Sequence, residues 1–310
     1  MSAPVEAPTP RELWRAVEGV HAVVYFSREV DDAVAAAGVT GWWRGYTAGR
    51  AAPMGAVGPA VVTATFATFA PSMVARNLPS AWAMASPDEV LAARLRGVVA
   101  AYGRLDGEDG SVGRGLASVV DVLDAAADAV PTLARPLAAA WAAHRSDVLA
   151  ARLDTVGGDG AAADPASVVV RAWLAATVVR EHRGDAHVAA LAAAGLDGCE
   201  AHLTLSGTGR VPADVLRGAR GWTDDDWAAA TDRLRRRGLL DDRGRLTPTG
   251  QAVRAEVEAA TDEAAAGPWS AVAAADRCHL VAVLGPIGRL VAERLPIRVP
   301  NPMGWEPLTS

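Results

Sequence analysis

The sequence predicts a mainly α-helical protein built from two winged-helix halves that are related by internal duplication, with a small β-hairpin wing in the C-terminal half. Three observations support this fold class. Apolar residues recur at helical spacing along most of the chain. Glycine and proline separate these segments. The stretch RLRRRGLLDDRGRLTPTGQAVR (233–254) has the order helix end, hairpin, helix start.

Length and composition predict two helical domains. The 310 residues are 51% hydrophobic, which is enough for two cores of ordinary size. A linker rich in glycine and alanine at 157–165 divides the chain. We expect a disordered tail at 1–10, a diverged winged-helix-like domain at 11–156, a winged-helix domain at 166–295 and a tail at 296–310.

The expected location is the cytoplasm. No apolar run reaches the roughly 18 residues of a membrane span, so no membrane partner is predicted. The start MSAPVEAPTP has neither the basic nor the hydrophobic region of a secretory signal. The two cysteines, Cys199 and Cys278, do not suggest a disulfide framework.

The first half is expected to be helical; residues 60–70 are rich in β-branched side chains and also fit a strand, but a buried helix is favoured because the neighbouring segments are helical. Ser86 is a predicted N-cap, because Pro87, Asp88 and Glu89 follow it in the order typical of a helix start. The predicted helices span 11–26, 28–37, 41–50, 60–70, 86–102, 115–128 and 131–153.

The second half is expected to add the wing. Its predicted helices span 167–182, 185–194, 212–219 and 223–237, and a long helix begins at Thr249 or Gly250 and ends near 266. Between the last two, residues 239–247 are predicted to form two short strands joined by Asp242–Gly244.

An internal repeat suggests how the halves are related. AAAGVTGWWRGY (35–46) aligns without a gap with AAAGLDGCEAHL (192–203), which pairs Gly38 with Gly195 and Gly41 with Gly198. The alternative is that alanine-rich helices ending in glycine look alike by composition. Duplication predicts a pseudo-twofold packing, hence a monomeric pseudo-dimer or a homodimer.

Four segments resemble a family of actinobacterial proteins described as MarR-like helix-turn-helix proteins. They are VHAVVYF (20–26), RGYTAGRAAPMGAVG (44–58), VVREHRGDAHVAALAAAGLDGCEA (178–201) and RGWTDDDWAAATDRLRRRGLL (220–240). The resemblance implies a tandem winged-helix fold. It does not imply a particular activity, because a fold does not determine function.

The charge pattern weighs against tight DNA binding. The chain has a net charge of −6, and the helix predicted at 223–237, which would enter the major groove, carries Asp224, Asp225 and Asp226 in its first turn. DNA binding is therefore the alternative function, a MarR-like transcriptional regulator, with Arg233, Arg243 and Arg245 as its candidate contacts.

Histidines and tyrosines suggest a polar pocket between the halves. His182 and His187 are five residues apart beside several carboxylates, and His21 and Tyr25 share a helix face. The repeat offset of 157 aligns Tyr25 with His182, and a pseudo-twofold packing would bring both toward the interface between the halves. Tyr25, His182 and His187 are the candidates for acid–base catalysis; the other interpretation is a buried polar network. No metal-ligand spacing or cofactor motif is present, so neither group is expected.

Aromatic residues and one arginine complete the predicted ligand site. Trp43, Tyr46 and Arg50 fall on one helix face, an arrangement suited to a planar or anionic ligand, or else to core packing. With Glu200 they join His21, Tyr25, His182 and His187. The sequence thus favours a small-molecule-binding protein. A DNA-binding regulator and an enzyme of specialised metabolism using the same pocket remain the alternatives.

Overall fold

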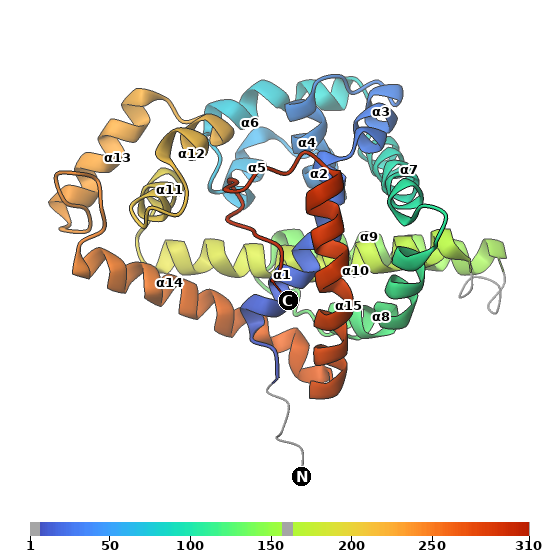
Figure 1. Cartoon of the computed structure of the whole chain (residues 1–310). Helices are drawn as coiled ribbons and strands as arrows, with labels where there is room; N and C mark the ends of the chain where they lie inside the picture. The colour runs from blue at the N-terminus through green and yellow to red at the C-terminus, as the bar shows by residue number, and fades with distance from the viewer. Residues whose placement is uncertain (1–6, 157–163, 310) are drawn as a thin grey trace, which may run out of the picture.

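The computed structural model describes residues 7–156 and 164–309, and within these ranges the chain is helical (Figure 1). Residues 157–163 of the predicted linker and the first six residues of the predicted N-terminal tail lie outside the described residues, whereas Asp164 and Pro165 cap and begin α10. The longer helices are α1 (Pro10–His21), α3 (Arg28–Ala36), α4 (Trp42–Ala51), α7 (Pro87–Asp106), α8 (Ser111–Asp128), α9 (Pro136–Val156), α10 (Pro165–Ala193), α11 (Gly198–Ser206), α12 (Ala213–Arg220), α13 (Asp224–Arg236), α14 (Pro248–Ala266) and α15 (Ala274–Arg294). The shorter ones are α2 (Val23–Phe26), α5 (Pro59–Thr65), α6 (Pro71–Asn77) and the 3₁₀ turns η1 (Ala52–Met54), η2 (Ser80–Ala83) and η3 (Gly267–Ala271).

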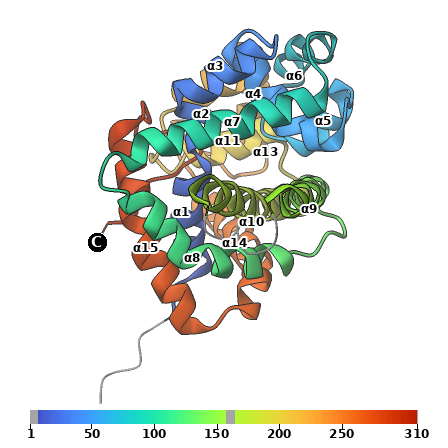
Figure 2. The ribbon, with the colours of Figure 1, turned by 90° about the vertical axis from the view of Figure 1, so that its right-hand side faces the viewer.

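The central element is α10, which is buried on all sides. It packs against α1, α7, α8, α9 and α14, and Figure 2 shows α7 on one side of it, α8 on the other and α9 alongside. A helix surrounded in this way must be apolar around its circumference. Residues 168–170 and 172–176 accordingly contribute to the main core.

The continuity of α10 corrects the predicted break between 182 and 185. The helix passes through Gly184 without interruption. A glycine inside a helix costs only about 1 kcal/mol relative to alanine, and burial on every face outweighs that cost. Asp185 does not start a helix; its carboxylate instead accepts hydrogen bonds from the backbone N–H groups of Leu137 and Ala138, at 3.1 and 3.0 Å, and so caps α9.

A smaller unit, here called the outer unit (residues 198–247, α11 to α13 and the loop that follows), lies at one end of α10 and α14 (Figure 1). It has its own apolar cluster, to which Leu203, Leu234, Leu240 and Leu246 belong. Thr223, at the start of the helix predicted over 223–237, caps α13 together with Asp226. The outer unit is therefore a separately packed helical group seated on the long helices.

No two-stranded wing is seen in the described residues, so that prediction is wrong. The loop after α13 contains one isolated antiparallel bridge, between Leu240 and Leu246. Asp241 tightens the turn by accepting hydrogen bonds from the N–H groups of Arg243 and Arg245. Thr247 already caps α14, so no residues remain to extend a second strand.

Internal duplication is not seen either. Gly38 and Gly195 are alike in ending a helix at positive φ (100° and 63°). Gly41 also has positive φ, whereas Gly198 is the first residue of α11 and is needed because an added Cβ would lie 1.8 Å from the carbonyl oxygen of Ala67. The similarity of the two segments is explained by their alanine-rich composition and by glycine at helix ends, which was the alternative interpretation of the repeat.

The predicted N-cap at Ser86 is confirmed. Ser86 forms a reciprocal capping box with Glu89 at the start of α7. The apolar segment expected to be helical over 60–70 is helical only to Thr65. The segment 66–69 then turns and contacts the outer unit through the carbonyl of Thr68, which accepts hydrogen bonds from His202 and Trp222.

The C-terminal segment packs back onto the molecule. Trp305 is fully buried and donates a hydrogen bond to the carbonyl of Arg15 at 2.9 Å. Asn301 holds the turn that delivers it, through hydrogen bonds with the backbone of Met303 and Trp305. The segment thereby forms part of the wall of the central cavity described below.

Over the described ranges, none of the helices taken singly has the length and hydropathy needed to cross a membrane. Only α14 with η3 and α15 together reach that composition, and they are bent by 109° where they meet.

Candidate functional site

A buried ion pair joins α4 to α10. The Arg50 side chain donates to both carboxylate oxygens of Glu181, Nε to Oε1 at 3.0 Å and Nη2 to Oε2 at 2.9 Å. Burial by itself would raise the pKa of Glu181, but the charges of Arg180 and Arg50 lower it to about 2. The carboxylate also raises the pKa of Arg50 despite burial, so both groups are charged.

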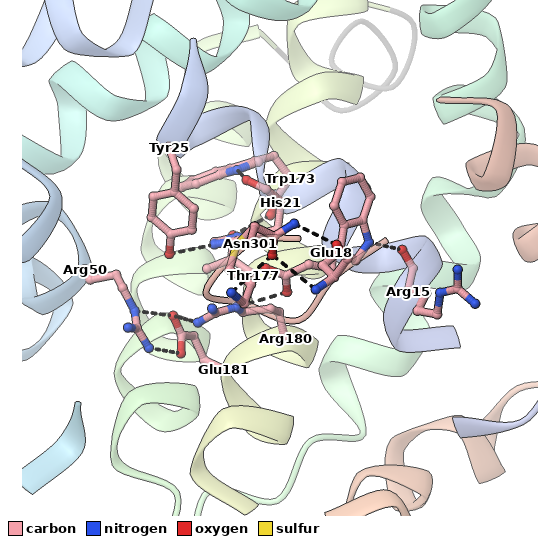
Figure 3. Close-up of polar contacts among 12 residues, drawn as sticks. Arg15, Glu18, His21, Tyr25, Arg50, Trp173, Thr177, Arg180, Glu181 and Asn301 are labelled. Carbon is pink, nitrogen blue, oxygen red and sulfur yellow. Dashed lines mark hydrogen bonds and ion pairs between the residues drawn. The ribbon is translucent and has the colours of Figure 1, made fainter. Parts of the chain in front are cut away.

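The ion pair extends to α1 through Arg180 (Figure 3). Arg180 contacts Glu181 at 2.9 Å and Glu18 at 3.2 Å. Glu18 is 1% exposed, and its second carboxylate oxygen has no hydrogen-bond partner among the described residues. Positive and negative charges alternate along this series of contacts, from Arg50 through Glu181 and Arg180 to Glu18. Each buried charge therefore has an opposite charge beside it in a region of low dielectric constant.

A second network lies beside the first and is neutral. The Thr177 hydroxyl donates to the carbonyl of Trp173 at 2.7 Å, so its oxygen accepts from His21 Nδ1 at 2.9 Å. His21 Nε2 is then unprotonated and accepts from the Tyr25 hydroxyl at 2.9 Å. Burial holds the pKa of His21 well below its usual range and raises that of Tyr25. Both residues form the satisfied network that the alternative interpretation predicted.

A cavity of about 230 Å³ lies between the helical core and the outer unit. Residues of α1, α4 and α10 line one side, residues of α11, α12 and α14 the other, and the segments 65–69 and 300–306 complete it. Its lining includes three glutamates (Glu18, Glu258 and Glu306) and seven arginines (Arg11, Arg50, Arg180, Arg183, Arg210, Arg220 and Arg254). The walls are therefore strongly basic.

The arginines differ in how they are compensated. Arg254 donates to Glu258 at 2.9 Å, and Arg183 pairs with Asp262 at 2.6 Å. Arg220 forms no ion pair with any described carboxylate: it stacks on Phe69 at 4.4 Å and donates one hydrogen bond, to the carbonyl of Pro302 at 3.1 Å. Its Nε is buried without a partner, and burial lowers its pKa.

The two histidines of the cavity are neutral. The Thr261 hydroxyl donates its hydrogen to the carbonyl of Val257. Its oxygen therefore accepts a hydrogen bond from His187 Nδ1, at 3.1 Å. His202 donates to the carbonyl of Thr68 at 3.1 Å. Burial lowers the pKa of His187 to about 4 and that of His202 to about 3. The positive charge of the cavity therefore comes from arginine alone.

The structure brings together only part of the predicted ligand site. Tyr46, Arg50 and His187 line the central cavity. Trp43 packs against Trp42, Tyr46 and Phe69.

The remaining predicted residues lie elsewhere. His182 donates from Nε2 to the carbonyl of Ala264 at 3.0 Å, and burial lowers its pKa. Glu200 caps α11 and pairs with Arg233 at 2.8 Å. Of the three catalytic candidates, His187 lines the central cavity, whereas Tyr25 and His182 do not.

The arginines predicted to contact DNA are mostly engaged within the protein. Arg233 pairs with Asp197 and Glu200, and Arg245 pairs with Asp241. Arg243 is exposed, and its side chain has no hydrogen bond or ion pair with the described residues.

Several site residues were missed by sequence reasoning. Glu18 and Arg180 lie on helices α1 and α10 among buried valines, and a charge within an apolar helix face is the signal that could have identified them. Arg220 precedes a helix-ending glycine and therefore resembles an ordinary C-terminal cation. Its position on the cavity wall follows only from the tertiary structure.

The comparison with protein families gives one result. A model described as a helix-turn-helix family matches residues 10–297. The chain belongs to this helix-turn-helix family. In the outer unit, α12 and α13 are joined by a short turn in which Gly221 has the left-handed backbone conformation. The order of these elements is helix, turn, helix, as in the family's description. The curated proteins contain no significant match, and neither do the solved structures.

Proposed function

We propose that this helix-turn-helix protein binds a small organic polyanion in the central cavity, between the outer unit and the helical core. The single observation that carries the proposal is Arg220, a cation on the cavity wall that pairs with no described carboxylate. Arg220 is half-buried and donates to the carbonyl of Pro302, but its Nε is a buried donor without an acceptor among the described residues, and leaving such a donor unpaired is costly. An anionic ligand would supply that partner, and arginine suits carboxylate or phosphate groups geometrically.

The position of the cavity gives the ligand a possible effect on the outer unit. Arg220 belongs to α12, Arg254 to α14 and Arg50 to α4, so one anion would be held by elements on both sides. A ligand that contacts both sides favours the closed arrangement of the outer unit and the core over an open one. The size of this shift equals the difference in its binding free energy to the two arrangements. Binding would then be read out as greater rigidity of the outer unit.

Weak DNA binding is part of the same proposal. The first turn of α13 exposes Asp224 and Asp225, which would face phosphates in a major groove. At the other end of α13, Arg235 donates to the backbone carbonyls of Asp241 and Asp242 in the outer unit, and Arg237 donates to carbonyls at the end of α10, those of Ala194 and Gly195. Their charges stabilise helix ends and loops of the protein itself.

Thermal unfolding and calorimetry with citrate, succinate, inorganic phosphate and acetate test the ligand proposal. Citrate and succinate are expected to raise the melting temperature with concentration and to bind more tightly than acetate, because several arginines line the cavity. Arg220→Gln should abolish this effect. The matched control is Arg217→Gln on the same helix, whose partner Asp224 is exposed.

Two results would reject the proposal. One is binding of the polyanions with equal affinity by the wild type and Arg220→Gln. The other is the absence of any saturable response to citrate, succinate and phosphate in a folded wild-type protein.

A MarR-like DNA-binding regulator is the second candidate. Arg236 and Arg243 favour it, because both are exposed and neither side chain has a hydrogen bond or an ion pair with another described residue. A fluorescent duplex of mixed sequence should then bind at low salt and dissociate at physiological salt, and the double substitution Arg236→Ala/Arg243→Ala should abolish binding. Arg245→Ala is the control, since Arg245 already pairs with Asp241. Duplex binding unchanged by the double substitution would exclude this surface.

No specific observation favours the enzyme alternative. Its acid–base candidates Tyr25 and His182 lie outside the central cavity, and His187 lines it as a neutral donor.

A further inference from the structure

A second cavity, also of about 230 Å³, lies beside α3 and α4. It shares only Tyr46 with the lining of the central cavity. Its walls are mostly apolar and aromatic, with Val24, Val30, Val34, Val39, Trp42 and Tyr25 among them. A cavity of about 150 Å³ already admits a benzene-sized molecule, so this one has room for a small organic ligand.

Arg94 of α7 is the only basic residue in the lining of this second cavity, and it is 2% exposed. It has no ion pair and no hydrogen bond with the described residues, and its Nε and Nη2 are buried without acceptors. Its guanidinium carbon lies over the Tyr25 ring, 5.8 Å from the ring centroid. Arginine remains protonated in proteins, so this is a buried cation with no counter-ion in the part of the chain that the structure describes.

The fold makes room for this cation through Gly49. A Cβ built on Gly49 would lie 2.0 Å from Arg94 Nη1 and 2.5 Å from its Cδ. Gly49 lies inside α4, where glycine is normally unfavourable. The glycine therefore keeps open the space in which the guanidinium lies.

The surrounding charges select the class of anion. Asp31 and Asp32 also line the cavity and are exposed. With one arginine against two aspartates, a polyanion such as phosphate would be repelled, whereas a single negative charge can pair with Arg94. The valines and Trp42 would accept a hydrocarbon chain.

We propose that the second cavity is a binding site for a short-chain monocarboxylate, whose carboxylate pairs with Arg94 and whose carbon chain lies against the valines and Trp42. The two cavities share Tyr46 but use different arginines, Arg94 here and Arg220 in the central cavity, so either ligand proposal can fail without the other.

Calorimetry with the wild-type protein and the series acetate, butyrate and hexanoate tests the proposal. Each added methylene buried against the apolar wall should lower the Kd about fourfold until the cavity is filled. Hexanol, which has the chain without the charge, should bind at least tenfold more weakly than hexanoate. Equal affinity for hexanol and hexanoate, or preferential binding of inorganic phosphate, would overturn the proposal.

Two substitutions assign the site to Arg94. Arg94→Met should abolish hexanoate binding while the protein stays at least as stable to urea as the wild type, since an uncompensated buried charge has been removed. Gly49→Ala should weaken binding by displacing the guanidinium. Arg96→Met, at an exposed position of the same helix, is the matched control. Hexanoate binding that survives in folded Arg94→Met would refute the assignment.

If Arg94→Met does not fold, calorimetry of the wild type with acetate, butyrate, hexanoate and hexanol still tests the proposal. Two results with the wild type alone would refute the site. One is equal affinity for hexanoate and hexanol, and the other is the absence of saturable binding by all three acids.

Discussion

Arg50 and Glu181 are 131 residues apart in the chain and form two parallel hydrogen bonds, of 3.0 and 2.9 Å, inside the protein. The pair fixes α4, and with it the aromatic residues Trp43 and Tyr46, against α10. Both proposed ligand sites lie next to α4. The geometry of either site therefore depends on this ion pair.

Breaking the pair should be costly. Arg50→Met is expected to lower the free energy of unfolding by about 3–5 kcal/mol, because Glu181 would lose its bidentate partner in a buried site. Urea denaturation measures the loss. In a double-mutant cycle, Arg50→Met with Glu181→Leu should cost less than the sum of the single substitutions. Arg76→Met, at an exposed position, is the control, and additive costs in the cycle would contradict a coupled pair.

Acid should remove the contribution of Glu181. The pKa of Glu181 in the folded protein, about 2, is below its ordinary value of 4.5, so the unfolded chain binds the proton first as the pH falls. The stabilisation is present above about pH 4.5 and is lost between there and pH 2. The difference in unfolding free energy between the wild type and Glu181→Gln should shrink over this window. A difference independent of pH would contradict it.

His202 should contribute a second acid transition at higher pH. Its pKa is lowered from 6.5 to about 3 by burial, so the folded state resists protonation that the unfolded state accepts. Stability is therefore complete above about pH 6.5 and falls progressively toward pH 3.

His202→Gln keeps a donor for the carbonyl of Thr68 and should reduce this dependence on pH between 6.5 and 4. The ring resonances of His202 in NMR spectra should show no titration down to pH 5. A midpoint near 6.5 would show that the ring is not buried as described.

Gly198 should not tolerate a side chain. Its Cβ would lie 1.8 Å from the carbonyl oxygen of Ala67, which is backbone and cannot move aside cheaply. Gly198→Ala is expected to cost about 2–4 kcal/mol by thermal or urea unfolding, at the high end of single substitutions.

Gly218→Ala is the matched comparison. Gly218 lies inside α12 with nothing within 4 Å of an added Cβ. The alanine should stabilise the protein by about 0.5–1 kcal/mol. Similar effects at the two glycines would contradict the close approach of the segment 66–69 to α11.

The sequence alone was sufficient for the local elements. Helical class, the capping box at Ser86, the cap at Thr223 and the helix-ending glycines Gly38 and Gly195 follow from short-range hydrogen bonding and backbone preferences. Mainly α architecture and membership of a helix-turn-helix family agree with that analysis.

Tertiary packing decided what local preferences do not control. Helix α10 continues through Gly184 because it is packed against other helices on every side. The predicted hairpin has only one bridge because Thr247 already caps α14. The partners of Arg50, Arg94 and Arg220 could not be inferred from spacing. Whether an arginine is paired, stacked or left without a counter-ion depends on groups far away in the chain that only the folded protein brings near.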